Sequence, residues 1–342
     1  MLELCALGEA LEDRVGKNYG YGVPVRIDYE TASRGRQSAV LHTISPGPFG
    51  HEHMSDRAQI LLQQHQTFNR MRGHVRSLDV GGFGRGGDLI SLGGVEEFCL
   101  LTEYAEGEPY VRDLERIGAT NIATATDLAR ADALCDFLVD IHRVHDHKPG
   151  LYVRRIRELV GHGECVMGLA DSFPPDNLFS PRVLEEIELR FVGWRWRLKD
   201  LTHRLREVHG DFHPWNILFG SGGDLRTLDR SRGEFGEPAD DVACLSINYF
   251  FFSLRRWGRL DGAFETLFRR FWERYLDRSG DAEMLKVVAP FFAFRCLVLA
   301  NPVWYPNLSE IVRSRLLIFM LAVLDGGDFE PSRMNNYCGA EN

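Results

Sequence analysis

The sequence predicts an α+β chain in which a small antiparallel sheet precedes a larger, helical part. Alternating apolar and polar residues recur at 23–31 and 97–104, the period that buries one face of a strand. Beyond residue 127, apolar residues recur every three or four positions, the period of a helix packed on one side. Strands first and helices later, over 342 residues, indicate two lobes.

The N-terminal elements follow in order. Apolar residues at helical spacing from Leu4 to Val15 predict a helix over residues 2–15. A turn at Ser33–Arg36 separates the first strand from a second, and Ser55 or Asp56 caps a helix that runs to about Met71. The further strands are predicted at 37–44, about 75–80, 88–92 and 97–104.

The glycine-rich run Gly82–Gly87 fits a phosphate-binding pattern by its letters. It follows the helix predicted to end at about Met71, and no helix begins directly after it. We therefore interpret this run as a hairpin turn. Residues 31–37, with a single glycine, are the better candidate for a loop over a nucleotide.

The C-terminal part is predicted as a series of helices, beginning with Asp127 to His145. The others lie at about 150–162, 182–206, 240–256, 260–278, 282–300 and 308–325. The aromatic run Tyr249–Phe252 has helical spacing, which favours core packing over base stacking on nucleic acid.

Composition excludes several classes of protein. The net charge of −9 disfavours nucleic acid and anionic membrane surfaces as partners. Seven scattered cysteines without a C-x-x-C pair indicate reduced thiols. The acidic start lacks an export signal, and the longest apolar run, Val287–Ala300, is short and contains Arg295. We therefore expect a cytoplasmic protein without a membrane span.

The most informative stretch is Val208 to Phe219, followed by Thr227-Leu228-Asp229. It carries Asp211, Asn216 five residues later, and Asp229 thirteen residues after that. Phosphoryl transfer needs a carboxylate beside the accepting hydroxyl, and an amide and a second carboxylate to hold Mg²⁺ against phosphates.

This H-G-D-x-H-x-x-N-x-L-F motif resembles the catalytic loop of the aminoglycoside phosphotransferase and choline kinase-like family, within the protein-kinase-like superfamily. The later segment Gly236-x-Pro-x-x-Asp241-x-Ala is also similar. The resemblance implies that Asp211 is the catalytic base, with His213 shaping the loop. It further implies that Asn216 and Asp229 bind Mg²⁺, and that Asp241 braces the catalytic loop.

The resemblance extends to the segment Glu97–Gly107, which is similar to the strand and hinge of that family. It implies a nucleotide-binding lobe over residues 1–104 and a lobe with the catalytic loop and acceptor pocket over 105–342. Adenine would then bond to the backbone of Glu103 and Ala105.

One position departs from the family pattern. His42 stands where the phosphate-binding lysine is expected, and no lysine lies between Asn18 and Lys148. Three alternatives remain: His42 binds phosphate, a neighbouring arginine does so, or catalysis is weakened. The candidate arginines are Arg34, Arg36 and Arg57, and the nearest acidic partner is Glu52.

Two further groups have open interpretations. His162 and Glu164 either face the acceptor or belong to a helix end. Arg230 and Arg232 either reach phosphate or an anionic acceptor, or lie in a solvated loop, or pair with Glu234 and Glu237.

These features predict Mg²⁺-dependent transfer of the γ-phosphate of ATP or GTP to a hydroxyl of a small molecule. The alternatives are a kinase of peptide hydroxyls and a non-catalytic nucleotide-binding relative, the latter suggested by the missing lysine.

Overall fold

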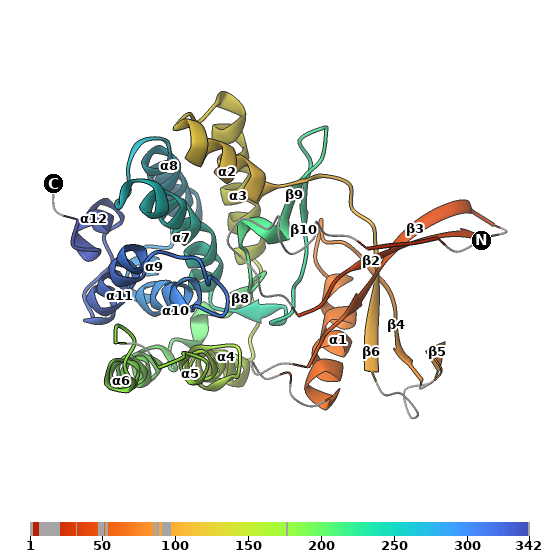
Figure 1. Ribbon diagram of the computed structural model, residues 1–342, viewed down its shortest axis with the longest axis horizontal. Coiled ribbons are helices and arrows are strands. Elements are labelled where there is room, and N and C mark those ends of the chain that lie inside the picture. Colours follow the sequence, from red (N-terminus) through yellow and green to blue (C-terminus); the bar gives the residue numbers. More distant parts are fainter. Residues whose placement is uncertain are drawn as a thin grey trace.

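The protein has a sheet at one end and a helical body at the other (Figure 1). The structure is a computed structural model that describes residues 3–6, 21–31, 33–46, 51, 54–84, 86, 89–90, 97–175 and 177–340. This division confirms the predicted α+β fold, with the sheet built from the N-terminal residues. The predicted boundary at residue 104 falls just after the last long strand of the sheet, β6 (Glu97–Glu103).

The sheet is antiparallel, with the order β1-β2-β3-β6-β4-β5. Its other strands are β1 (Glu3–Ala6), β2 (Val25–Thr31), β3 (Gly35–Thr43), β4 (Ser77–Phe83) and β5 (Leu89–Ile90). Helix α1 (Met54–Phe68) packs on one face, where Leu61 and Phe68 meet Leu100 in a buried cluster. The apolar face of α1 thus supplies the cover that a half-buried sheet requires.

The prediction of a helix over residues 2–15 is wrong at its start. Residues Glu3–Ala6 form a strand whose Leu4 pairs with Ile27 of β2. Pairing with the edge of a sheet satisfies backbone groups that a single helical turn leaves open. The remainder of that predicted helix lies outside the described residues.

The glycine-rich run is confirmed as part of a hairpin. Gly82 and Phe83 end β4 and pair with Ile90 and Leu89 of β5. A backbone engaged in strand pairing does not form a phosphate-cradling loop.

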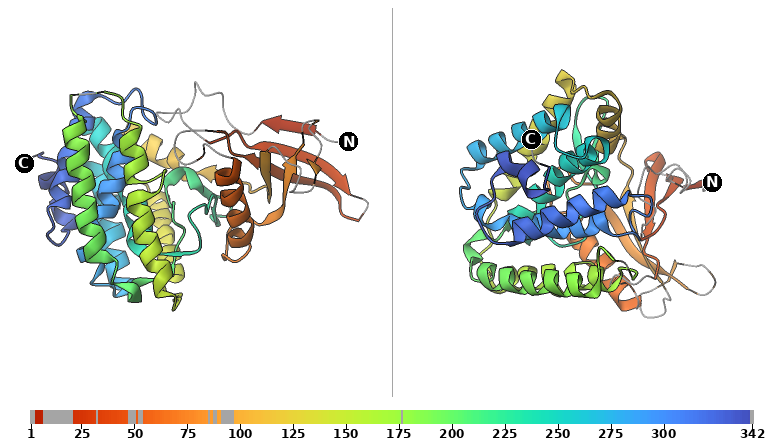
Figure 2. Two further views of the ribbon diagram at one scale, coloured as in Figure 1. Left: turned by 90° about the horizontal axis from the view of Figure 1, so that it is seen from below. Right: turned by 60° about the vertical axis from the view of Figure 1, so that its left-hand side comes forward.

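The helical part contains the predicted helices, with shifted ends. They are α3 (Ala125–His142), α4 (Pro149–Gly161), α6 (Pro181–Leu198), α7 (Pro238–Trp257), α8 (Gly262–Ser279), α9 (Met284–Val287), α10 (Ala289–Ala300) and α11 (Glu310–Leu324). The helix predicted over 182–206 ends at Leu198, and the one predicted over 282–300 is divided between α9 and α10. Figure 2 shows α4 and α6 beside the C-terminal helices.

Three short helices were not predicted: α2 (Tyr110–Thr120), α5 (Val166–Asp171) and α12 (Met334–Tyr337). Helix α2 had a usable signal, because Val111, Leu114 and Ile117 recur at helical spacing and are buried.

The core of the helical part lies around α7. Tyr249, Phe250, Phe251 and Phe252 are all buried there, which confirms core packing for the aromatic run. Pro238 at the first turn and Gly258 in the left-handed conformation set the two ends of α7. Among the described residues, no helix is long and apolar enough to cross a membrane.

Candidate functional site

The catalytic loop is fixed from beneath by Asp241, near the start of α7. The buried Asp241 carboxylate accepts the backbone N–H groups of His209 and Gly210, each at 2.7 Å. His142 Nε2 lies 3.2 Å from the same carboxylate, and Tyr275 holds the other ring nitrogen at 2.8 Å. Asp241 therefore has the bracing contacts that the resemblance implied.

Asp211 lies at the surface of this braced loop with 18% of its side chain exposed. Its Oδ1 is 2.6 Å from Arg295 Nη1, and its Oδ2 is 3.4 Å from His213 Nε2. Burial raises the pKa of the Asp211 carboxyl, but the charges of His213 and Arg295 outweigh burial and hold that pKa well below its ordinary value. The carboxylate is thus ionised at neutral pH and can accept a hydrogen bond.

Arg295 is the main site residue that sequence reasoning missed. It projects from α10, is buried, and contacts Asp240 Oδ1 at 2.6 Å as well as Asp211. Its Nη2 also donates to the carbonyl of Gly210 at 3.2 Å. A single arginine in the apolar run Val287–Ala300 was the available signal, because a buried cation requires a partner.

Asn216 and Asp229 meet at the base of a hairpin formed by β9 (Ile217–Phe219) and β10 (Leu225–Thr227). Thr227 pairs with Ile217, and the N–H of Leu228 donates to the carbonyl of Asn216 at 2.9 Å. This register brings Asp229, the residue after Leu228, to the same end of the hairpin as Asn216.

The two side chains suit a magnesium ion shared with phosphates. Asn216 Nδ2 donates to the Asp211 carbonyl at 3.1 Å, which leaves its amide oxygen as the ligand atom. Asp229 has a φ of 55°, uncommon for a residue other than glycine, and Gln64 of α1 donates to its Oδ1 at 3.2 Å. No cluster of three or more potential ligands occurs within the described ranges. An amide and a carboxylate completed by phosphate oxygens and water fit the hard-oxygen preference of Mg²⁺.

The predicted nucleotide contacts lie on β3 and β6. The N–H of Glu103 bonds to the carbonyl of Arg76, and the chain leaves the sheet after Glu103 toward Ala105. His42 Nε2 lies 3.1 Å from Thr102 Oγ1, on the face of the sheet that α1 covers. Burial lowers the pKa of His42 to about 4, so its ring is neutral at pH 7.

The candidate arginines lie elsewhere. Arg34 and Arg36 belong to the β2–β3 hairpin, whose turn lies at the end of the sheet away from the helical part (Figure 1). Arg36 and His42 lie six positions apart along β3, a distance of roughly 20 Å. Arg57 is buried and donates to the carbonyl of His51 at 2.8 Å. This arrangement favours His42 over Arg36 as a neighbour of the phosphates, and it does not favour residues 31–37 as the covering loop.

The two arginines after Asp229 have different surroundings. Arg230 is fully buried, pairs with Glu207 at 3.1 Å and donates to the carbonyls of Val208 and Glu234, so it holds the segment together. The pairing of Arg230 with an acid is thus with Glu207, and not with the side chains of Glu234 or Glu237 that the sequence suggests.

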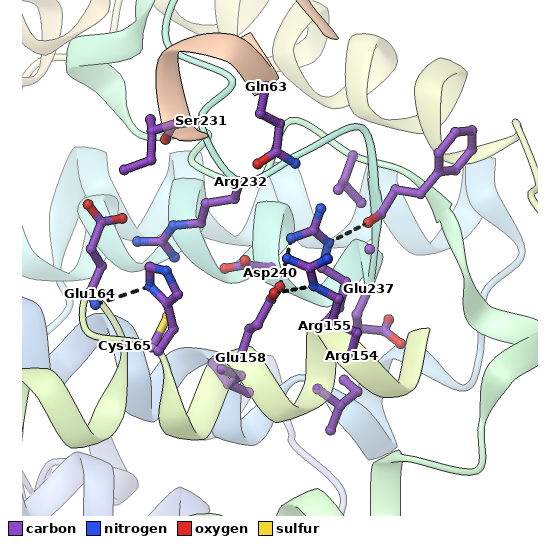
Figure 3. Close-up of a pocket in the computed structure, with 18 of the residues that line it drawn as sticks. Gln63, Arg154, Arg155, Glu158, Glu164, Cys165, Ser231, Arg232, Glu237 and Asp240 are labelled. Carbon is purple, nitrogen blue, oxygen red and sulfur yellow. Dashed lines mark hydrogen bonds and ion pairs between the residues drawn. The ribbon is translucent and has the colours of Figure 1, made fainter. Parts of the chain in front are cut away.

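Arg232, in contrast to Arg230, points into a cavity (Figure 3).

That cavity has a volume of about 220 Å³ and lies between α1, α4 and the segment 231–240. It reaches the catalytic loop at Gly210, next to Asp211. His162 and Glu164, left open by the sequence, both line it. A cavity of this size beside the catalytic loop suits a small ligand better than a polypeptide chain.

The family comparison agrees with this geometry. Residues 39–281 match the family model described as the phosphotransferase enzyme family. No curated protein sequence matches the chain closely enough to count as a relative.

Two solved structures share the fold at low sequence identity. One is the amicoumacin kinase hAmiN in complex with AMP-PNP, Ca²⁺ and Ami, at 15% identity and a TM-score of 0.57, covering 91% of this chain and 89% of that chain. The other is the ethanolamine kinase of Plasmodium vivax, at 12% identity and a TM-score of 0.51, covering 99% and 80% respectively. The predicted kinase-like fold and the enzyme class are thereby confirmed, and the chain belongs to the phosphotransferase enzyme family.

Proposed function

We propose that the protein is a small-molecule kinase that transfers the γ-phosphoryl group of ATP or GTP to a hydroxyl, with Mg²⁺ as cofactor. One observation carries the proposal: the ionised Asp211 carboxylate lies in a loop in which Asn216, five residues later, is hydrogen-bonded to the segment that carries Asp229. The solved kinase that binds AMP-PNP and a divalent ion supports the nucleotide and the metal.

The chemistry assigns a role to each side chain. The acceptor hydroxyl donates a hydrogen bond to Asp211, and its oxygen forms the new bond to the γ-phosphorus. The bond from that phosphorus to the bridging oxygen breaks, the nucleoside diphosphate leaves, and the hydroxyl proton passes to Asp211. Because the pKa of Asp211 is depressed, it chiefly orients the hydroxyl and takes the proton late.

The remaining roles concern binding. Asn216 and Asp229 would hold Mg²⁺, which when bound neutralises charge on the phosphates. The backbone of Glu103 and Ala105 would bind the base, and His42 would lie near the phosphates as a neutral imidazole. His213 orients Asp211 through their contact at 3.4 Å.

The cavity next to Gly210 favours a small acceptor over a peptide. A non-catalytic relative is the second candidate, because strand β3 supplies a histidine instead of a lysine. Retention of Asp211 beside the metal-binding pair argues against it, since nucleotide binding alone does not need that carboxylate.

Phosphate transfer from labelled ATP and GTP to a panel of hydroxylated metabolites tests the proposal. The panel includes amino sugars, peptides and water as acceptors, each with and without Mg²⁺. Mg²⁺-dependent labelling of a small molecule is expected. Labelling of peptides alone would indicate a kinase of peptide hydroxyls instead. Nucleotide binding without transfer to any acceptor or to water would indicate a non-catalytic relative.

A further inference from the structure

The acidic side chains that line the cavity already have partners. Glu158 contacts Arg154 at 2.5 Å and Arg155 at 2.7 Å, and Glu237 contacts Arg204 at 2.7 Å. Their charges are thus satisfied within the protein, and Figure 3 shows the contacts of Glu158.

The same holds for the acids nearer the catalytic loop. Asp240 contacts Arg295 at 2.6 Å, and Glu164 lies 2.5 Å from His51 Nε2. Asp56, on the α1 side, also has an interaction partner. A cationic acceptor would have to compete with the arginines that already contact Glu158, Glu237 and Asp240.

Arg232 is in the opposite situation. Within the part of the chain that the structure describes, its guanidinium has no hydrogen-bond or ion-pair partner, although its charge interacts at longer range with Asp211 and Asp240. Its guanidinium carbon lies 5.1 Å from the centroid of the Phe294 ring. A guanidinium carries five N–H donors in a planar fork that matches an oxyanion. The side chain is only partly exposed, so the protein leaves these donors for water or for a ligand.

The position of Arg232 assigns it to the acceptor side. It packs against Gly210, where an added Cβ would meet the Arg232 Cβ at 3.1 Å, and it lines the cavity together with Ser231. Asn216 and Asp229, the proposed metal ligands beside the nucleotide phosphates, do not line this cavity.

We infer that the acceptor carries an oxyanion, either a carboxylate or a phosphate monoester, which Arg232 binds in this cavity. The inference rests on the proposed function and names its substrate class. The anionic group and the reacting hydroxyl would then belong to one molecule that spans from Arg232 to Asp211.

The first test measures anion binding directly, with inorganic sulfate as the probe. The full chain is saturated with Mg²⁺ and AMP-PNP, and sulfate is titrated calorimetrically at constant ionic strength. Wild type and Arg157→Gln, a matched exposed control on α4, should bind sulfate saturably. Arg232→Gln should bind it about 10- to 100-fold more weakly, as expected for loss of a charge-assisted contact. Equal affinity in all three proteins, or no saturable binding to wild type, overturns the inference.

A second measurement separates the acceptor from the nucleotide. The affinities of Arg232→Gln for ADP and AMP-PNP should each stay within about twofold of wild type. A selective loss of AMP-PNP affinity would assign Arg232 to the γ-phosphate and overturn the inference. Arg232→Lys, which keeps the charge without the planar fork, should retain an intermediate sulfate affinity and guards against a folding defect in the glutamine variant.

The third test compares acceptors that share one scaffold: glycerate, glycerol 3-phosphate, glycerol and 2-amino-1,3-propanediol. Among those phosphorylated, an anionic member should have the highest kcat/KM, and Arg232→Gln should remove its advantage mainly through KM. A preference for the neutral or amine member contradicts the inference but leaves the kinase assignment intact. If none of the four is phosphorylated, the transfer of phosphate to water still tests whether the protein is a kinase. The sulfate titration then tests the anion site independently.

Discussion

The catalytic loop and strand β3 differ in the charge of their side chains. Around the loop, Asp211 and Asp240 are ionisable groups bridged by the buried Arg295 at 2.6 Å to each. On β3, the position expected to carry a lysine holds His42, whose neutral ring lies against Thr102. The loop therefore holds ionised side chains next to one another, whereas the strand offers a neutral, hydrogen-bonding side chain. Under the proposed function, this difference predicts that the nucleotide phosphates are held chiefly from the catalytic side, through Asn216 and Asp229.

Removing the charge of Asp211 tests the catalytic side most severely. Asp211→Asn should reduce turnover by about 10²- to 10⁴-fold, because the amide no longer accepts the proton of the acceptor hydroxyl. Nucleotide affinity should stay within about twofold, since the carboxylate acts on the acceptor. Steady-state rates and calorimetry, with the exposed Asp200→Asn as control, measure both. Turnover within threefold of wild type would exclude Asp211 as the base.

Arg295 tests how the loop is held. Arg295→Gln leaves Asp211 and Asp240 without their shared cation, and should lower the free energy of unfolding by about 3 kcal/mol or more. Burial already raises the pKa of Asp240 despite Arg295, so that carboxyl should take up a proton at higher pH in the variant. Urea unfolding reports the stability, and Arg269→Gln, exposed on α8, is the matched control. A loss no larger than that of the control would show that the bridge is not a structural support.

Buried histidines, both in the sheet-containing part and next to the catalytic loop, predict a loss of stability in mild acid. Burial lowers the pKa to about 4 for His42 and His209 and to about 3 for His74. The unfolded chain, with histidines near 6.5, binds more protons below that pH, so stability present above pH 6.5 is lost as the pH falls toward 4. Each histidine contributes up to about 1.4 kcal/mol per pH unit.

Urea unfolding at pH 7, 6 and 5 measures that slope. His74→Gln should flatten it, whereas substitution of the exposed His147 should not. An unchanged slope in His74→Gln would mean that His74 is not held neutral in the folded protein.

The smallest expected effect concerns strand β3. If His42 lines the nucleotide site as a neutral imidazole, affinity for nucleotide should vary less than about twofold between pH 6 and 8, because the ring does not titrate there. His42→Lys should tighten binding by adding a cation near the phosphates. A fall in affinity from pH 6 to 8 that disappears in His42→Ala would instead show that His42 binds as imidazolium.

The predictable part of the site was the part that is local in sequence. Asp211, Asn216, Asp229 and Asp241 occupy one continuous stretch whose spacing carries the chemistry, and the hairpin and brace contacts bear out their arrangement. The catalytic and metal-binding roles themselves stay predictions.

The remaining contacts come from distant elements. Arg295 of α10 and Gln64 of α1 reach the site only through tertiary packing, which periodicity does not encode. In the same way, the pairing of Glu3–Ala6 with β2 overrode a short helical pattern.

Nucleotide binding and phosphate transfer measured on the same samples test the central claim most directly. Wild type and Asp211→Asn are each saturated with Mg²⁺ and labelled ATP, occupancy is determined by calorimetry, and labelled product is quantified over the acceptor panel. The proposed role of Asp211 predicts equal occupancy, labelled small-molecule product with wild type, and a loss of about 10²- to 10⁴-fold with Asp211→Asn. Equal product from both proteins at equal occupancy would contradict it.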